Sequence, residues 1–165
     1  MSKEALKIIG INPGTRYLGV AVLYESDLRD WRIKVFQEKW SDEKIKKMKK
    51  TISGLLEDYE PNVLAIKKLH PSRSSKNLKL ITAWIRESCK RKGLKILQSS
   101  IKELENFYLP NEKLNKKNLT KKITSDYPDL FYELDKENKN KNPYYIRMFE
   151  AVALASMCFQ KLDHH

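Results

Sequence analysis

Two apolar segments joined by a tight turn stand near the start of the chain and restrict its fold more than any other feature. Residues 7–12 and 18–24 are rich in isoleucine, valine and leucine, and Pro13 and Gly14 lie between them. Short apolar runs bounded by proline and glycine are typical of β-strands joined by a turn. The two runs are apolar enough for the inside of a sheet, so we expect a buried hairpin here.

The later segments alternate between helix and strand patterns. Further strands are predicted at 31–36, 63–66 and 94–97. Helices are predicted at 42–59 after a cap at Ser41 or Asp42, at 78–89, from Ser100 to before Pro110, after Asn118, and at 145–162, with a charged loop at 135–142. A buried strand that follows a helix is typical of parallel pairing. The order predicts an α/β fold, with a mixed five-stranded sheet whose first three strands are antiparallel, then β-α-β connections, and helices on both faces.

Length and composition restrict the class of protein. The 165 residues predict one domain spanning 1–165. No apolar run approaches the roughly 20 residues of a membrane helix, and no secretion leader is recognisable, so we expect a cytoplasmic protein without a membrane partner. Cys89 and Cys158 lie far apart and form no CxxC pair. They are expected to be reduced thiols rather than a disulfide or zinc ligands.

The chain is strongly basic. It has 33 lysines and arginines against 21 acidic residues, a formal charge of +12, and a pI near 9.6. Such a charge attracts polyanions, which favours nucleic acid as a partner. A lysine-rich background without any binding role is the alternative. A membrane surface is less favoured, because no basic amphipathic helix with an aromatic face is present.

Three motifs occur in a fixed order along the chain. They are Gly-Ile-Asn-Pro-Gly at 10–14 followed by Gly19, Val-Leu-Ala-Ile-Lys-Lys at 63–68, and Phe-Glu-Ala-Val-Ala-Leu-Ala at 149–155. With the predicted element order, they resemble the ribonuclease H-like fold, and in particular the RuvC-like Holliday junction resolvases. Actin-like ATPases and sugar kinases open with a similar hairpin, but they need two such domains and a longer chain. Other RuvC relatives also open this way, although the proline-glycine pair and the basic third quarter fit the resolvases better.

The resemblance implies a nuclease site that is incomplete in this chain. Family members hold two magnesium ions with four carboxylates, and the matching positions here are Asn12, Lys67, Arg147 and Glu150. One neutral, two cationic and one anionic residue give a formal charge of +1. We therefore expect no intact catalytic set, no bound metal and no cofactor. We also predict a direct ion pair between Lys67 and Glu150 in place of the lost metal.

The absence of carboxylates from three of these four positions also fits a displaced site or an engineered exchange. Acidic residues elsewhere could form a displaced site, although none stands at the expected strand ends; the candidates are Glu25, Asp27, Glu38 and Glu87. An engineered replacement of an aspartate by asparagine at position 12 would not explain the lysine at position 67. This favours natural loss of the metal-binding carboxylates.

Several basic or polar residues are candidates for binding nucleic acid. The turn after Pro13 offers backbone groups and two donors to a phosphate, His70 stands where resolvases often carry a stacking aromatic, and a lysine-rich block resembles the segment that holds the DNA backbone. The candidates are Thr15, Arg16, His70, Arg73, Lys76, Lys113, Lys116, Lys117, Lys121 and Lys122. For each, a solvated surface or loop role is the alternative. By analogy with resolvases, Leu80, Ile81 and Trp84 suggest a homodimer contact.

The resulting functional prediction is a nucleic-acid-binding RuvC-like protein. It is expected to be a catalytically inactive resolvase homologue that binds branched or structured DNA by shape. One alternative is an active metal-dependent junction endonuclease with an atypical ligand set. Another is an interaction subunit without a nucleic-acid role.

Overall fold

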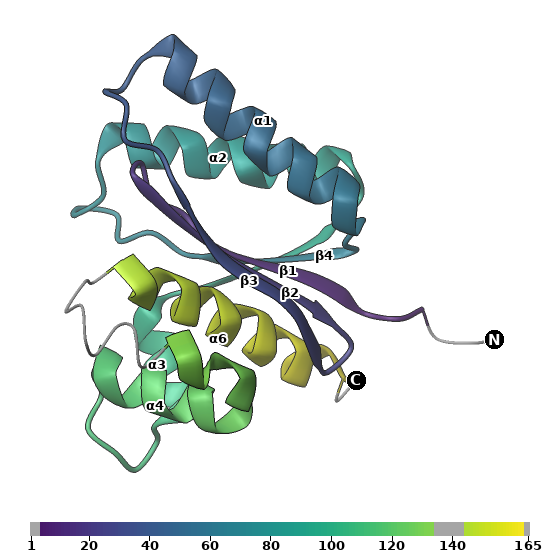
Figure 1. The fold of residues 1–165 in the computed structure, drawn as a ribbon, viewed down its shortest axis with the longest axis vertical. Helices are drawn as coiled ribbons and strands as arrows, with labels where there is room; N and C mark the ends of the chain where they lie inside the picture. Colours follow the sequence, from purple (N-terminus) through teal and green to yellow (C-terminus); the bar gives the residue numbers. More distant parts are fainter. Residues whose placement is uncertain (1–3, 134–143, 164–165) are drawn as a thin grey trace.

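A central sheet divides the protein into two layers of helices. The computed structural model describes residues 4–133 and 144–163. The five strands lie in the order β3-β2-β1-β4-β5 (Figure 1). Their bounds are β1 (Lys7–Asn12), β2 (Tyr17–Tyr24), β3 (Asp27–Val35), β4 (Val63–Lys67) and β5 (Lys95–Ser99). The predicted α/β fold with a mixed five-stranded sheet is confirmed.

The direction of pairing changes in the middle of the sheet. Strands β1, β2 and β3 form an antiparallel meander, whereas β4 pairs parallel to β1 and β5 parallel to β4. In the first ladder Asn12 is opposite Gly19, and in the parallel ladder Ile11 is opposite Ile66. The third strand begins at Asp27, four residues before the predicted start, because the β2–β3 connection is only a two-residue turn.

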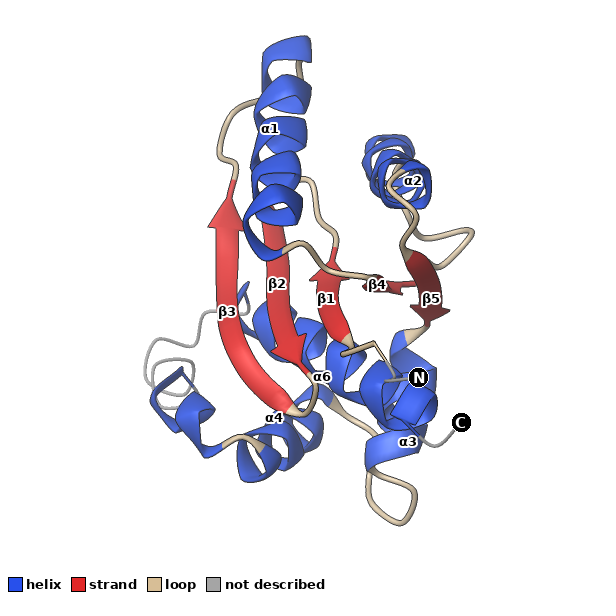
Figure 2. Ribbon diagram, turned by 90° about the vertical axis from the view of Figure 1, so that its right-hand side faces the viewer, coloured by secondary structure: helices blue, strands red, loops and turns tan. Residues whose placement is uncertain are grey.

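Helices cover both faces of the sheet, as predicted (Figures 1 and 2). On one face lie α1 and α2, and on the other lies α6, with α3 and α4 packed beside it. Their bounds are α1 (Asp42–Tyr59), α2 (Lys76–Arg91), α3 (Ile101–Tyr108), α4 (Lys116–Asp126) and α6 (Tyr144–Asp163), with a 3-10 turn, η1, at Pro128–Leu130. Within the described residues, no helix is both long and apolar enough to cross a membrane.

Alternate residues of β1 pack into two separate hydrophobic cores. Ile9 and Ile11 join the core under α1 and α2, whereas Ile8 joins the core under α6. The two cysteines are also divided, with Cys89 in the first core and Cys158 in the second, and both are free. Burial raises the pKa of the Cys89 thiol to about 11 and that of the Cys158 thiol to about 12. Both thiols therefore stay protonated and unreactive at neutral pH.

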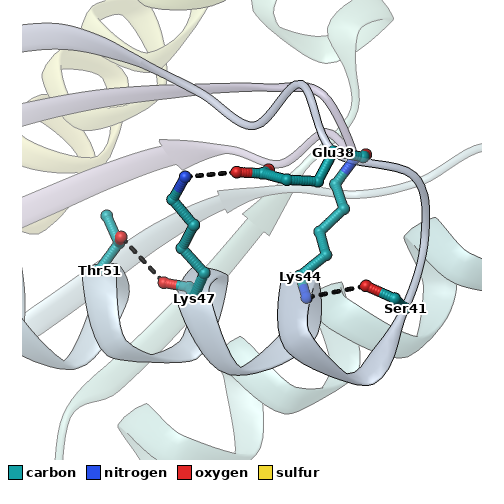
Figure 3. Close-up of polar contacts among 5 residues, drawn as sticks. All are labelled: Glu38, Ser41, Lys44, Lys47 and Thr51. Atoms are coloured by element: carbon teal, nitrogen blue, oxygen red, sulfur yellow. Dashed lines mark hydrogen bonds and ion pairs between the residues drawn. The ribbon is translucent and has the colours of Figure 1, made fainter.

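The start of α1 shows how local chemistry fixes the helix ends (Figure 3). The hydroxyl of Ser41 accepts a hydrogen bond from the backbone N–H of Lys44 at 3.1 Å, as the sequence predicts for an N-cap. The Lys44 Nζ atom donates to the backbone oxygen of Glu38 at 2.7 Å, and Lys47 forms an ion pair with the Glu38 carboxylate. These contacts tie the end of the β3–α1 connection to the first turns of the helix.

The caps of the short helices confirm one local prediction and correct another. Ser100 and Glu103 form the predicted capping box of α3. The cap of α4 is Asn115 rather than Asn118, since the Asn115 side chain accepts a hydrogen bond from the Asn118 backbone N–H at 2.8 Å. The Asn118 amide instead donates to the backbone oxygen of Lys113. The predicted loop at 135–142 lies outside the described residues.

Candidate functional site

The site forms where β1 and β4 end side by side. Because the two strands are parallel and Ile11 is opposite Ile66, the next residues, Asn12 and Lys67, leave the sheet at the same edge. Helix α6 crosses this edge on one face and contributes Glu150 and Arg147, which lie one turn apart. All four residues matched from the sequence are therefore brought together.

Asn12 and Glu150 form a buried hydrogen bond at the centre of the site. The Asn12 Nδ2 atom donates to Glu150 Oε1 at 3.0 Å, and the two residues are 0% and 3% exposed. The other oxygens of the pair, Asn12 Oδ1 and Glu150 Oε2, have no hydrogen-bond partner within the described part of the protein. A carboxylate at position 12 could not have donated this bond, so the asparagine is suited to a neighbouring glutamate.

The predicted direct ion pair between Lys67 and Glu150 is wrong. No such ion pair is formed among the described residues; Asn12 holds one carboxylate oxygen and the other has no partner. Lys67 still acts on Glu150 through space. Burial lowers the pKa of Lys67, the charge of Glu150 raises it, and the charges of Arg147 and Lys116 lower it further.

The carboxyl group of Glu150 is surrounded by positive charge but poorly solvated. Burial raises its pKa, while the charges of Lys67, Lys116 and Arg147 and the hydrogen bond from Asn12 oppose that rise. Three cationic side chains from three different elements therefore act on one buried carboxyl group.

Arg147 is held against the turn of the opening hairpin. Its Nη1 atom donates to the backbone oxygen of Pro13 at 3.2 Å. An added Cβ at Gly14 would lie 2.7 Å from that same nitrogen, and one at Gly19 would lie 2.1 Å from the backbone oxygen of Arg147. The glycines of the opening motif therefore allow α6 and its arginine to lie directly against the hairpin.

The remaining predicted binding residues lie on the connections around the site and on α4. Thr15 and Arg16 are in the β1–β2 turn, His70 and Arg73 are in the β4–α2 connection, and Lys76 begins α2. Lys113 precedes α4, while Lys116, Lys117, Lys121 and Lys122 lie on it, and Lys122 pairs with Asp126 at 3.5 Å. All except the half-buried Thr15 are exposed. Of this set, Lys116 is the one whose charge acts on both Lys67 and Glu150.

His70 has a local structural contact that sequence reasoning missed. Its Nδ1 atom accepts hydrogen bonds from the backbone N–H groups of Ser72 and Arg73, at 3.3 and 3.2 Å. This short-range pattern shapes the turn that follows β4. The ring is exposed, so its contact with the turn does not prevent it from stacking on a base.

The predicted dimer residues on α2 face different surroundings. Ile81 is fully buried in the core beneath α2, so the prediction that it contacts a second copy is wrong. Trp84 packs partly against that core, with the Lys49 ammonium 5.4 Å from its ring centre. Leu80 is exposed.

The donor set does not fit a pair of magnesium ions. Magnesium prefers anionic oxygen ligands in octahedral geometry. Of the four matched positions, only Glu150 supplies a carboxylate, and its negative charge is opposed by three cations. Nowhere in residues 4–133 and 144–163 do three or more His, Cys, Asp or Glu side chains gather as a metal site would need.

Two features of this site were not predicted from the sequence. The donation from Asn12 to Glu150 could have been inferred, because an amide beside a lone carboxylate has both a donor and a reason to face it. The special position of Lys116 had no signal, since five lysines occur between residues 113 and 122.

No protein-family model matches the sequence, and no curated protein is significantly similar to it. Solved structures are similar in fold. RuvC from Thermus thermophilus superposes with a TM-score of 0.70, at 10% identity over 96% of this chain and 97% of that chain. The yeast mitochondrial Holliday junction resolvase Ydc2 gives 0.65, at 14% identity over 97% and 81%.

A third structure, the fowlpox virus resolvase in complex with Holliday junction DNA, gives a TM-score of 0.61 at 16% identity over 95% of this chain and 99% of that chain. These likenesses span nearly the whole length of the chain, and they agree with the resemblance inferred from the three motifs. The protein has the ribonuclease H-like fold of the RuvC and Holliday junction resolvases.

Proposed function

We propose that this protein binds branched or structured DNA without cleaving it. The observation that supports the proposal is that an amide and two cations stand at three of the four positions matched to the family's carboxylates. At the edge of the sheet where Asn12 and Lys67 meet α6, one buried carboxyl group is hydrogen-bonded to an amide and surrounded by cations. Such a set attracts phosphate but supplies too few anionic ligands to hold the ions that cleave it.

The fold and the charge support DNA as the partner. Two of the similar structures, those of Thermus thermophilus RuvC and the fowlpox virus resolvase, are complexes with Holliday junction DNA. This protein carries a formal charge of +12, and the exposed lysines of α4 include Lys117 and Lys121. Backbone contacts of this type position a duplex without reading its bases, so binding is expected to follow DNA shape.

The test is a gel-shift and cleavage assay on a four-way junction, with duplex and single-stranded DNA of the same sequence. We expect tighter binding to the junction, a steep loss of affinity with added salt, and no cleavage with magnesium or manganese. The double variant Lys117→Glu/Lys121→Glu is expected to weaken binding to every substrate. An absence of salt-dependent binding to all three DNAs would refute the proposal and favour an interaction subunit.

One observation favours an atypical metal-dependent nuclease as a second candidate. Asn12 Oδ1 and Glu150 Oε2 are buried oxygens without a described partner, and both are possible ligands for a single cation. Junction cleavage that requires manganese and is lost in Glu150→Gln would establish this candidate. Pairing of two copies through the helix that contains Trp84, and a cytoplasmic location, stay predictions.

A further inference from the structure

We propose that the outer edge of β3 is a docking site for an extended segment of a partner protein in which apolar and acidic residues alternate. The segment would lie along β3 and add a further strand to the sheet. In this mode of recognition, main-chain hydrogen bonds supply affinity and alternate side chains supply specificity. Strand β3 is at one edge of the sheet, and β2 separates it from β1, which carries Asn12 (Figure 2).

The hydrogen-bond pattern shows which backbone groups of β3 face outward. One residue beyond the end of β3, the N–H of Phe36 donates to the backbone oxygen of Arg16 at 2.7 Å. Because bonded and non-bonded pairs alternate in an antiparallel ladder, the N–H and C=O groups of Val35, Ile33 and Trp31 point away from β2. Among the described residues, no other hydrogen bond uses these groups. Each of the three residues therefore presents a donor and an acceptor to an added strand.

The opposite edge of the sheet presents fewer such groups. In β5, the N–H of Lys95 donates to the backbone oxygen of Asn62, which precedes β4, at 3.1 Å. Every second residue faces the same way, so Ile96 and Gln98 are the residues that face outward in this five-residue strand. The nine-residue β3 is therefore the better template for an added strand.

A cavity lies beside the β3 edge on the face of the sheet that α6 covers. Its volume is about 330 Å³, and it is lined by Trp31, Ile33 and Val35 from the strand and by Tyr145 and Met148 from α6. Val35 is 43% exposed. Covering this apolar surface favours an apolar side chain of the partner. Since side chains of a strand alternate between the two faces of a sheet, we expect every second residue of the segment to be apolar.

The face of β3 that α1 covers carries an ammonium group without a partner. Arg32 is on this face, because it donates to the hydroxyl of Tyr59, the last residue of α1, at 3.2 Å. Lys34 is on the same face, two residues along the strand. Arg32 forms an ion pair with Asp30, whereas Lys34 forms none with any described residue. An acidic residue opposite Lys34 would form a cross-strand pair of opposite charge.

Charge also decides which face of the segment is acidic. Glu133 contributes to the lining of the cavity, so an acidic side chain is disfavoured on the α6 face and favoured on the α1 face, beside Lys34. The net charge of +12 attracts an acidic segment over longer distances. The same charge disfavours a second copy of this chain at this edge, because the two copies repel each other. The partner segment is therefore apolar toward α6 and acidic toward α1.

The experiment measures, by fluorescence anisotropy, the binding of a short labelled peptide in which valine and glutamate alternate. The matched control peptide, in which valine and lysine alternate, is expected to bind about tenfold more weakly, because its charges repel Lys34. Amide hydrogen exchange, followed by NMR, locates the bound peptide. The glutamate peptide is expected to slow exchange at Trp31, Ile33 and Val35, whose N–H groups it would occupy.

Two pairs of variants test the charge and the backbone separately. Lys34→Glu is expected to weaken binding of the glutamate peptide about tenfold, and Lys92→Glu, the same change at an exposed residue after α2, to weaken it less. Val35→Pro removes one outward N–H at a position where an edge strand tolerates proline. It is expected to weaken binding about fivefold, and Val35→Ala, which keeps the N–H, to weaken it less. Thermal denaturation shows whether each variant is folded.

Each contrary result has its own meaning. Absence of binding by wild type, or binding that Lys34→Glu and Val35→Pro leave unchanged, would refute the site. Slower exchange at Ile96 and Gln98 instead of at the β3 residues would place the peptide at the other edge and also overturn the proposal. If wild type sediments as a dimer without peptide and Val35→Pro as a monomer, the edge belongs to a second copy and not to a partner. Because no DNA is present, none of these results bears on the proposed function.

Discussion

Gly19 is the residue at which the packing of α6 can be tested most directly. It lies opposite Asn12 in the β1–β2 ladder, and α6 passes over it. In Gly19→Ala, the new Cβ would lie 2.1 Å from the backbone oxygen of Arg147 and 2.5 Å from its carbonyl carbon. Both atoms belong to the helix backbone, so no side-chain rotation relieves the clash.

The size of the effect follows from these distances. Favourable contacts between heavy atoms begin at about 3.5 Å, so the helix and the strand must separate by more than about 1 Å. Overpacking of a core typically costs about 1–3 kcal/mol, and we expect a loss near the upper end, about 3 kcal/mol in the free energy of unfolding. The displacement would also move Glu150 away from Asn12, because Glu150 lies on α6 and Asn12 lies on β1 opposite Gly19.

The control is Gly54→Ala, in the middle of α1. An added Cβ there meets nothing within 4 Å, so the alanine is expected to stabilise the helix by about 0.5–1 kcal/mol. Equilibrium urea denaturation, followed by circular dichroism, measures both variants. With a slope of about 1–3 kcal/mol/M, Gly19→Ala is expected to lower the midpoint by about 1 M or more. A Gly19→Ala midpoint at or above that of wild type would refute the close packing of α6 on β2.

Two further predictions concern the stability of the fold. Burial raises the pKa of Glu150 in the folded protein. The folded wild type therefore binds a proton at this carboxyl group more tightly than the unfolded chain does. Its stability is expected to fall as the pH rises from the usual glutamate pKa through the raised pKa. Glu150→Gln is therefore expected to be more stable than wild type at neutral pH and to lack this decline. Urea denaturation midpoints of both proteins, measured from about pH 4 to about pH 8, test this expectation. A variant whose midpoints depend on pH as those of wild type do would contradict it. Ser41→Ala removes the side-chain acceptor of the α1 cap and is expected to cost about 1 kcal/mol, whereas Ser41→Asp is expected to retain most of the stability in the same measurement.

Much of the fold could be predicted because local and global signals agree. The apolar runs around Pro13 and Gly14 are strands on any physical reading, and Ser100 with Glu103 has the chemistry of a helix start. The cap of α4 was missed because Asn115 and Asn118 both suit the role and the lysine-rich sequence gives little periodicity to choose between them. Ile81 was misassigned because the analogy with resolvase dimers was given more weight than the apolar spacing that places it inside.

The sequence predicted which four residues lie together at the candidate site, but not which of them contact each other. The motifs gave Asn12, Lys67, Arg147 and Glu150, and the parallel pairing of β1 with β4 brings the first two together. Opposite charge alone suggested that Lys67 and Glu150 would pair. The sequence does not show that burial and two neighbouring cations disfavour the ammonium, or that the amide of Asn12 holds the carboxyl group.

The hydrogen bond between Asn12 and Glu150 also changes what the folded state requires from its surroundings. Two carboxylates at this separation would repel each other strongly in a buried place, and the native structure would then depend on counter-ions from the solvent. The amide removes that repulsion within the chain itself. We therefore expect chelators to leave the melting temperature unchanged, so that folding would not depend on the supply of divalent ions.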